Sequence, residues 1–150
     1  FAMTGYRAGS LIAGERVQAE VEKVMDCVAI CAPSISQSAA LFGLQSLSQW
    51  KAAKTAMMAG RREALLSAFS HPGLSYQLAS SGAYFAYVRH PFRGETSREV
   101  SKRLAQRHDV LCLPGSMFGP DQEDYLRLAF ANVAAEDMPV LAERLLESQA

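Results

Sequence analysis

Residues 111–131 read Leu-Cys-Leu-Pro-Gly-Ser-Met-Phe-Gly-Pro-Asp-Gln-Glu-Asp-Tyr-Leu-Arg-Leu-Ala-Phe-Ala, and they decide how the second half of the chain folds. Residues 110–113 predict a short strand that ends at a proline–glycine turn, and residues 125–131 predict a further strand. Leu126 and Leu128 flank Arg127, so the alternation of a strand places both leucines on one face of a sheet and the arginine on the other. Taken alone, this pattern is typical of an exposed arginine on an amphipathic strand.

The rest of the second half predicts the other elements of a small domain. Residues 83–88 are rich in aromatic residues and predict a strand. Thr96 and Glu99 have the spacing of a capping box, so a helix is expected to begin there. Residues 136–147 predict a closing helix with one apolar face. Strands and helices in this order favour an α+β domain with its helices on one face of a short sheet.

The first half is mainly helical. Charges followed by apolar residues predict a helix over 15–31, and an alanine-rich run predicts another over 37–47, with Ser34 or Ser36 as its N-cap. Apolar residues at three- and four-residue spacings predict a long helix over 48–69. Residues 7–13 are interpreted as a short buried strand.

The composition excludes several classes of function. The chain has 150 residues, of which 49% are hydrophobic and 20% are charged. Its 15 basic and 15 acidic side chains cancel, so no basic surface for nucleic acid or an anionic membrane is expected. Charges interrupt every apolar run, which argues against a transmembrane helix.

The three cysteines indicate the compartment. Cys27, Cys31 and Cys112 are odd in number and lie in apolar runs, which favours reduced, buried thiols in a cytosolic protein. Cys27 and Cys31 are four residues apart, but no further ligands lie near them, and we expect no metal site.

The chain opens with Phe1-Ala-Met-Thr-Gly5-Tyr-Arg7-Ala-Gly9. This segment resembles the stretch Ser-Lys-x-Phe-x-x-x-Gly-x-Arg of the class I/II aminotransferases, the fold-type I enzymes that use pyridoxal phosphate (PLP). Phe1, Gly5 and Arg7 match its Phe, Gly and Arg. The resemblance implies that Arg7 binds the cofactor phosphate and that the cofactor lysine lies upstream, two residues before Phe1. A planar guanidinium can hold a phosphate through two parallel hydrogen bonds.

A second, distant match lies in residues 114–131. Pro114-Gly-Ser-Met-Phe118-Gly and the following Arg127-Leu-Ala-Phe-Ala resemble the C-terminal signature of the same family, a Pro-Gly-x-x-Phe-Gly turn and an Arg-Leu-x-Phe-Ala strand. The resemblance implies that Arg127 binds the α-carboxylate of the substrate. Ser80 departs from a third family pattern, which has proline at this place before a Gly-aromatic strand; the departure affects neither arginine.

The resemblance implies an α/β fold that ends in an α+β small domain. Residues 1–48 would end the PLP-binding large domain, 49–70 would form an interdomain helix, and 71–150 would form the small domain, with a short sheet covered by helices. The implied cofactor is pyridoxal 5'-phosphate, the substrates are an amino acid and a 2-oxo acid, and the full-length protein is expected to be a cytoplasmic homodimer.

Three interpretations of function remain open at this point. The first is an aminotransferase, of which this chain holds part of the site but no catalytic lysine, so that the chain alone is expected to be inactive. The second is another fold-type I PLP enzyme, such as a carbon–sulfur lyase or a cyclopropane-carboxylate synthase. The third is a binding module that derives from the fold and has lost catalysis.

Overall fold

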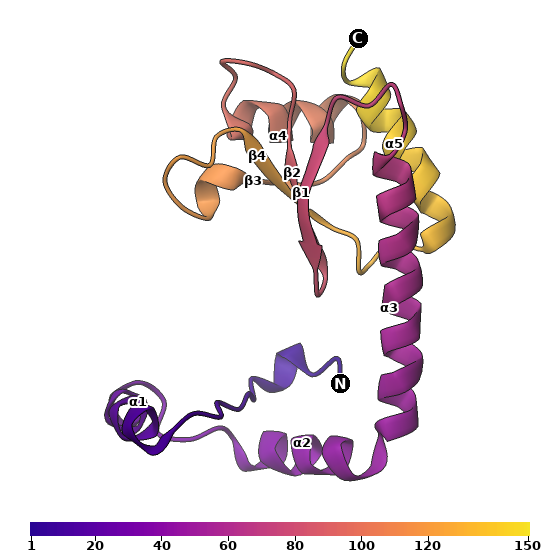
Figure 1. The fold of residues 1–150 in the computed structure, drawn as a ribbon. Coiled ribbons are helices and arrows are strands. Elements are labelled where there is room, and N and C mark those ends of the chain that lie inside the picture. Colours follow the sequence, from indigo (N-terminus) through magenta and orange to yellow (C-terminus); the bar gives the residue numbers. More distant parts are fainter. The chain divides into compact units, whose positions relative to one another are not determined.

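The computed structural model describes residues 1–150, which form two compact units, Phe1–Lys54 and Thr55–Ala150 (Figure 1). We describe each unit by itself. None of the helices combines the length and the apolar character that a membrane span requires.

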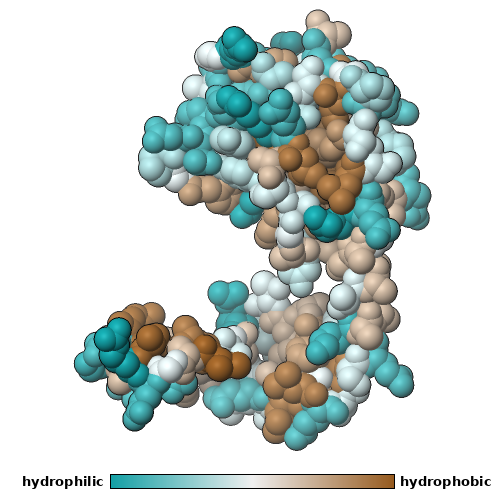
Figure 2. Space-filling model, in the orientation of Figure 1, coloured by the Kyte–Doolittle hydropathy of each residue, from teal (hydrophilic) through white to brown (hydrophobic).

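The first unit is helical and has few buried residues. It contains the short 3-10 helix η1 (Thr4–Tyr6), α1 (Glu15–Val28), α2 (Ser34–Ser46) and the beginning of α3 (Ser48–Phe69). Only Ser36 and Gly43 are buried in it, whereas Ile12 is 95% exposed. Figure 2 shows further hydrophobic residues, in brown, on the surface of this unit. This unit therefore has no hydrophobic core of its own.

The strand predicted over residues 7–13 is absent, and that prediction is wrong for this chain. Residues 8–14 have no regular secondary structure between η1 and α1. A strand is stable only when its backbone groups pair with a neighbouring strand, and no strand forms in the first unit. The helix bounds are better predicted, because α3 spans Ser48–Phe69 as expected. The helix after Pro33 begins at Ser34, with Pro33 rather than a serine at its N-cap.

The second unit contains one antiparallel sheet of four strands. They are β1 (Gln77–Gly82), β2 (Phe85–Arg89), β3 (Leu113–Pro114) and β4 (Tyr125–Ala129), in the order β1-β2-β4-β3. β4 thus lies between β2 and β3. The register pairs Ala86 with Leu128 and Tyr87 with Arg127.

The structure differs from the sequence prediction at three strands. β1 was not predicted, because Ser80, Ser81 and Gly82 give it little apolar character. The strand predicted over 83–88 begins at Phe85 because Ala83, with a φ of 48°, belongs to the β1–β2 turn. The strand predicted over 110–113 is reduced to the two residues of β3.

Three helices cover one face of this sheet. They are α4 (Ser97–Arg107), α5 (Met138–Glu147) and the second half of α3 (Figure 1). Their inward side chains pack with those of the strands in one core, whose members include Leu65, Val100, Leu104, Met138, Leu145, Ala86, Val88, Leu126 and Leu128. The small α+β domain with helices on one sheet face is therefore confirmed.

The N-terminus of α4 has the predicted capping box. The Thr96 hydroxyl accepts a hydrogen bond from the Glu99 backbone N–H, and the Glu99 carboxylate accepts one from the Thr96 backbone N–H. The two bonds satisfy amides that have no partner within the helix. Two residues three positions apart in the sequence thus fix where α4 begins.

The cysteine prediction was wrong for two of the three thiols. Cys112 is buried as expected, but Cys27 and Cys31 are exposed, and all three are free. Both exposed thiols lie in or just after α1, a helix with no buried residue. Their apolar neighbours have nothing in this unit to pack against.

Candidate functional site

Arg127 lies on the outer face of the sheet, where the alternation of β4 predicted it. Leu126 and Leu128 are 0% and 5% exposed and face the core, while Arg127 is half-buried on the opposite face. Because β2 and β3 flank β4 on its two sides, the arginine lies at the centre of the paired part of the sheet. Its backbone is therefore held by neighbours on both sides.

Two aromatic rings contact the guanidinium of Arg127. Its Cζ lies 4.2 Å from the centre of the Phe85 ring and 4.2 Å from the centre of the Phe118 ring. Phe85 begins β2 on one side of β4, and Phe118 follows β3 on the other side. The negative ring faces attract the cation. We call Phe85 and Phe118 the aromatic clamp.

The charge of Arg127 is not neutralised within the chain. The guanidinium takes part in none of the three ion pairs, and no carboxylate or carbonyl accepts a hydrogen bond from it. Its five N–H donors are thus free of protein acceptors while its carbon is packed against rings. A guanidinium in this state can bind a planar anion through its edge.

The turn that carries Phe118 is packed without spare room. It contains the 3-10 helix η2 (Gly115–Met117), and the Phe118 backbone N–H donates a 2.8 Å hydrogen bond to Gly115 O. A Cβ on Gly115 would lie 2.6 Å from Tyr125 O and would also collide with Gln122 O. Glycine is therefore required there by space, and the turn holds Phe118 at a fixed place beside β4.

A pair of tyrosines lies beside Arg127 on the outer face. The rings of Tyr87 and Tyr125 are stacked, with centres 5.1 Å apart, and the Tyr87 hydroxyl donates a 2.8 Å hydrogen bond to Gln122 Oε1. Partial burial raises the pKa of Tyr87, and Tyr125 raises it further, so its hydroxyl stays neutral and remains a donor. The stacked tyrosine pair thus places uncharged, mutually packed rings next to Arg127.

Arg7 occupies an unusual backbone conformation at the end of η1. Its φ of 54° places it in the left-handed region, which residues other than glycine rarely adopt. The backbone N–H and Nη1 both donate to Thr4 O, at 3.3 and 3.2 Å. No carboxylate pairs with the exposed guanidinium. Arg7 is thus the second arginine of the sequence prediction with an unneutralised charge.

The surroundings of Arg7 leave space for an anion. Its side chain borders a cavity of about 490 Å³ that is also lined by Gly5, Tyr6, Pro33 and Ser36. A Cβ on Gly5 would meet nothing within 4 Å, so packing within this chain does not require that glycine. The space and the free positive charge together fit a phosphate group.

Two contacts hold this segment against α2 and α3. The buried Ser36 hydroxyl donates a 2.6 Å hydrogen bond to Tyr6 O. The Phe1 ring stacks on Trp50 with centres 6.4 Å apart and lies against Gly43, where a Cβ would be 3.0 Å from Phe1 Cδ2. The turn that carries Arg7 is therefore attached at both ends.

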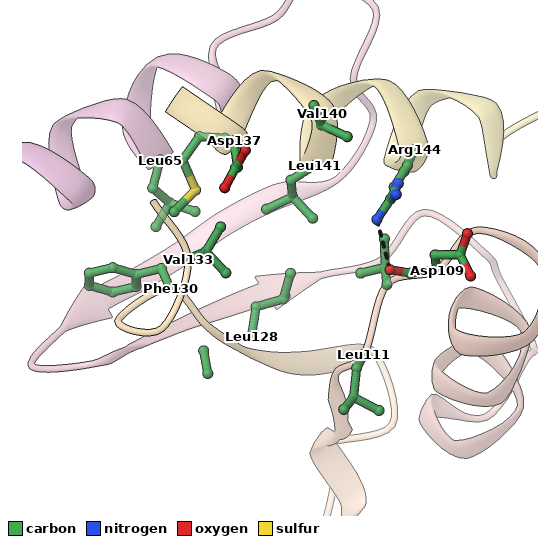
Figure 3. A pocket seen from close by; sticks show the side chains of 13 residues that line it. Leu65, Asp109, Leu111, Leu128, Phe130, Val133, Asp137, Val140, Leu141 and Arg144 are labelled. Carbon is green, nitrogen blue, oxygen red and sulfur yellow. Dashed lines mark hydrogen bonds between the residues drawn. The ribbon is translucent and has the colours of Figure 1, made fainter. Parts of the chain in front are cut away.

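An apolar pocket of the second unit lies away from Arg127. Its volume is about 340 Å³, and Leu128, Val133 and Leu141 lie around it, with Arg144 Nη1 donating a 3.0 Å hydrogen bond to Asp109 O at its edge (Figure 3). Leu128 points to the core side of β4, so this pocket is on the face opposite to Arg127. The guanidinium of Arg144 in this pocket already donates to Asp109 O, whereas no protein group accepts a hydrogen bond from Arg127, so Arg127 is the better candidate for binding a carboxylate.

Comparison with known proteins identifies the family. The sequence model described as Aminotransferase class I and II matches residues 1–145. The chain belongs to the class I and II aminotransferases. An aromatic aminotransferase of Arabidopsis thaliana is 28% identical over 148 residues, which cover 97% of this chain and 37% of that protein. An aspartate aminotransferase of Pyrococcus abyssi is 30% identical over 133 residues, which cover 87% of this chain and 34% of that protein.

Solved structures of aminotransferases share the fold. The crystal structure of an aromatic aminotransferase from Pyrococcus horikoshii OT3 superposes with a TM-score of 0.76 at 29% identity, over 98% of this chain and 39% of the other. The chain thus spans between a third and two fifths of the length of these aminotransferases. The matching part is their C-terminal portion, as the motif resemblance predicted.

Sequence reasoning proposed the two arginines as site residues but did not predict the residues that contact them. The aromatic clamp joins Phe85 and Phe118 from separate elements, and Ser36 contacts Tyr6 across thirty residues. Phe118 was visible in the sequence as part of the Pro-Gly-x-x-Phe-Gly motif. No spacing rule connects Phe85 with Arg127, because their contact depends on the register of β2 on β4.

Proposed function

We propose that this chain is the C-terminal part of a PLP-dependent aminotransferase, which transfers an amino group between an amino acid and a 2-oxo acid. The observation that carries the proposal is the free guanidinium of Arg127 on the outer face of β4, in a chain of this family. Membership of the family supports the reaction class. The unpaired charge supports a carboxylate as the ligand of this residue.

Arg127 is proposed to bind the α-carboxylate of the substrate. Its planar fork matches the two oxygens of a carboxylate, and lysine lacks that geometry. The cation also lies on a sheet strand that is paired on both sides, so its position is fixed before the ligand arrives. A carboxylate bound there would orient the amino group and the Cα–H bond of the substrate.

Arg7 is proposed to bind the phosphate of pyridoxal 5'-phosphate. No carboxylate neutralises the Arg7 guanidinium, and the cavity beside Gly5 and Ser36 leaves room for a ligand. Both observations support the fit, since a phosphate group that carries nearly two negative charges needs a cation and room for its oxygens. When bound, PLP supplies the electron sink of amino-group chemistry, and the protein contributes orientation and electrostatics. In this chain, the proposed contribution to orientation is the binding of the phosphate by Arg7.

The remaining parts of the proposal concern the whole protein. We infer that residues 1–48 end the large PLP-binding domain, 49–70 form the interdomain helix and 71–150 form the small domain. The lysine that carries PLP is expected upstream of Phe1, so we assign no catalytic residue within this chain. A cytoplasmic homodimer is proposed by analogy with the family, and the three free cysteines are compatible with a reducing compartment.

The test uses the full-length protein that carries this chain. It is incubated with PLP, single amino acids and a 2-oxo acid, and the exchange of the amino group is followed by mass spectrometry. Arg127→Lys is expected to raise the KM for the amino acid about ten- to a hundredfold, because a hydrogen bond between charged groups contributes about 1.5–3 kcal/mol. Arg107→Lys, in the last turn of α4, is the matched control.

Each alternative predicts a different result. A full-length protein that releases a 2-oxo acid and ammonia without an amino acceptor would be a lyase and not an aminotransferase. One that neither binds PLP nor reacts would support a non-catalytic binding module. If Arg127→Lys and Arg107→Lys gave the same KM for the amino acid, Arg127 would not bind the substrate carboxylate.

A further inference from the structure

The aromatic clamp restricts how the Arg127 side chain can move. Both rings lie 4.2 Å from the same Cζ atom, and they come from elements on opposite sides of β4. An arginine side chain on a surface normally samples many rotamers, and this freedom is lost when it binds a ligand. Rings that already hold the guanidinium reduce the freedom that remains to be lost.

Neither ring is part of the hydrophobic core. Phe85 is 39% exposed and Phe118 is 43% exposed, although both are large apolar side chains on a sheet unit with a well-filled core on its other face. Their position is explained by the cation between them, since no acidic residue is present to hold Arg127 instead. A carboxylate partner would fix the arginine equally well, but it would occupy the donors that the ligand needs.

We propose that Phe85 and Phe118 are positioning residues for the carboxylate arginine: the aromatic clamp holds the Arg127 guanidinium in one orientation while leaving its N–H edge free. The inference rests on the proposed function of Arg127. It adds a role for two residues to which the proposed function assigns no contact with substrate or cofactor. The rings act on the ligand only through the arginine.

The turn around Phe118 explains how one half of the clamp is fixed. The Phe118 N–H bonds Gly115 O, and Gly115 itself packs against the backbone that leads into β4. The ring is thereby tied to the strand that carries Arg127. Phe85 is tied in a similar way, because it pairs with Ala129 in the same ladder. Each ring is thus attached to β4 by backbone contacts.

The first measurement is the NMR signal of the Arg127 guanidinium in this chain. Rings stacked on the cation shift its side-chain protons upfield, and a held guanidinium gives slow relaxation of its Nε–H. Phe118→Leu and Phe85→Leu are each expected to reduce the ring-current shift and increase the motion of Nε–H. Phe118→Tyr keeps a ring and should preserve both values. Phe42→Leu, which removes an exposed aromatic ring of α2 that contacts neither clamp ring, is the control.

The second measurement is the kinetics of the full-length protein. Loss of one ring is expected to raise the KM for the amino acid about two- to fivefold, in keeping with the strength of an exposed cation–π contact. The kcat should change by less than the KM, and Phe118→Tyr should restore the KM. A general loss of folding would lower kcat and PLP affinity together. Phe118→Tyr would then not restore the KM selectively.

The outcomes separate the clamp from the proposed function. If Arg127→Lys raises the KM but the leucine variants leave both the KM and the Nε–H signal unchanged, the clamp is overturned and the role of Arg127 stands. If Arg127→Lys leaves the KM unchanged, the proposed function of Arg127 is refuted, and the clamp proposal, which rests on it, is refuted with it. Altered Nε–H motion without any rise in KM would also overturn a positioning role, since it would show that holding the guanidinium does not assist binding.

Discussion

The hydroxyl of Ser36 donates a 2.6 Å hydrogen bond to the backbone oxygen of Tyr6, the residue before Arg7. Ser36 is only 2% exposed and lies in the first turn of α2. The bond therefore connects a helix to the turn in which Arg7 adopts a left-handed conformation. Such a conformation costs energy and persists when surrounding contacts hold it.

Replacing Ser36 should therefore weaken the proposed contact of Arg7 with the cofactor phosphate. In the full-length protein, Ser36→Ala is expected to lower the affinity for PLP about two- to tenfold, which corresponds to the loss of one intramolecular hydrogen bond. Fluorescence titration of the apoprotein with PLP measures the change. Pyridoxal, which has no phosphate, should bind equally to both proteins because it makes no contact with Arg7.

The matched control is Ser34→Ala, at the first residue of the same helix, where the side chain is exposed. It should leave the PLP affinity unchanged. Equal losses for the two serine variants, or an equal loss for PLP and pyridoxal, would contradict a specific role of the Ser36–Tyr6 bond.

A second prediction concerns stability in acid. The Glu123 carboxylate accepts two hydrogen bonds from Ser97, one from the backbone N–H and one from the hydroxyl, each of 2.7 Å. The hydroxyl and backbone bonds lower the pKa of Glu123 below its ordinary value of 4.5. A lowered carboxyl pKa stabilises the fold above the unfolded-state pKa, and this contribution is lost as the pH falls through the folded-state pKa.

Glu123→Gln should therefore lower the Tm of this chain near neutral pH and have progressively less effect below about pH 4.5. Thermal unfolding at about pH 7 and about pH 3 measures the difference. Glu143→Gln, on the exposed side of α5, removes the same charge without a hydrogen-bonded partner and should leave the Tm nearly unchanged. A constant Tm difference between Glu123→Gln and the unsubstituted chain at both pH values would contradict the prediction.

Local sequence signals predicted much of the fold. The capping box of Thr96 and Glu99 fixed the start of α4, because both partners lie within one helical turn. The alternation of Leu126, Arg127 and Leu128 correctly assigned the two faces of β4. These features depend on neighbours in sequence, so they are visible without the rest of the structure.

Features that depend on distant partners were predicted less well. Residues 7–13 have the composition of a buried strand but no strand to pair with in this chain. β1 has too few apolar residues to be recognised, and it forms because β2 offers a pairing edge. For the candidate site, the resemblance suggested Arg7 and Arg127, which stay predictions, whereas the contacts of Ser36, Phe85 and Phe118 required the three-dimensional structure.

A third prediction distinguishes the cysteines by their accessibility. Burial raises the pKa of the Cys112 thiol to about 11, so it is protonated at neutral pH, while Cys27 and Cys31 are exposed. A disulfide reagent at about pH 8 should therefore modify two thiols of this chain rapidly and the third only after unfolding, since the thiolate is the reactive form.

Single substitutions assign the reacting thiols. Cys112→Ser should leave the rapid phase with two equivalents, whereas Cys27→Ser or Cys31→Ser should each remove one. Rapid reaction of Cys112 in the folded chain would show that the core of the second unit opens readily.

The last prediction concerns Gly115, which follows β3 and begins the turn that carries Phe118. An alanine Cβ there would collide with Gln122 O and lie 2.6 Å from Tyr125 O, and both are backbone atoms that cannot rotate away. Gly115→Ala is therefore expected to destabilise the second unit by about 1–3 kcal/mol, the usual range for an overpacked position. Thermal or denaturant unfolding of this chain measures the loss.

Gly60, in the middle of α3, is the matched control because a Cβ there would meet nothing within 4 Å. Gly60→Ala should stabilise the chain by up to about 1 kcal/mol, as alanine favours the helix more than glycine does. Opposite signs of the stability change for the two glycine-to-alanine substitutions would mean that space, and not backbone freedom, requires glycine at position 115.

Displacement of the turn that carries Phe118 should also move its ring, so Gly115→Ala is expected to reduce the ring-current shift of Arg127. If Gly115→Ala were as stable as the unsubstituted chain and kept that shift, the close packing of the turn would be refuted.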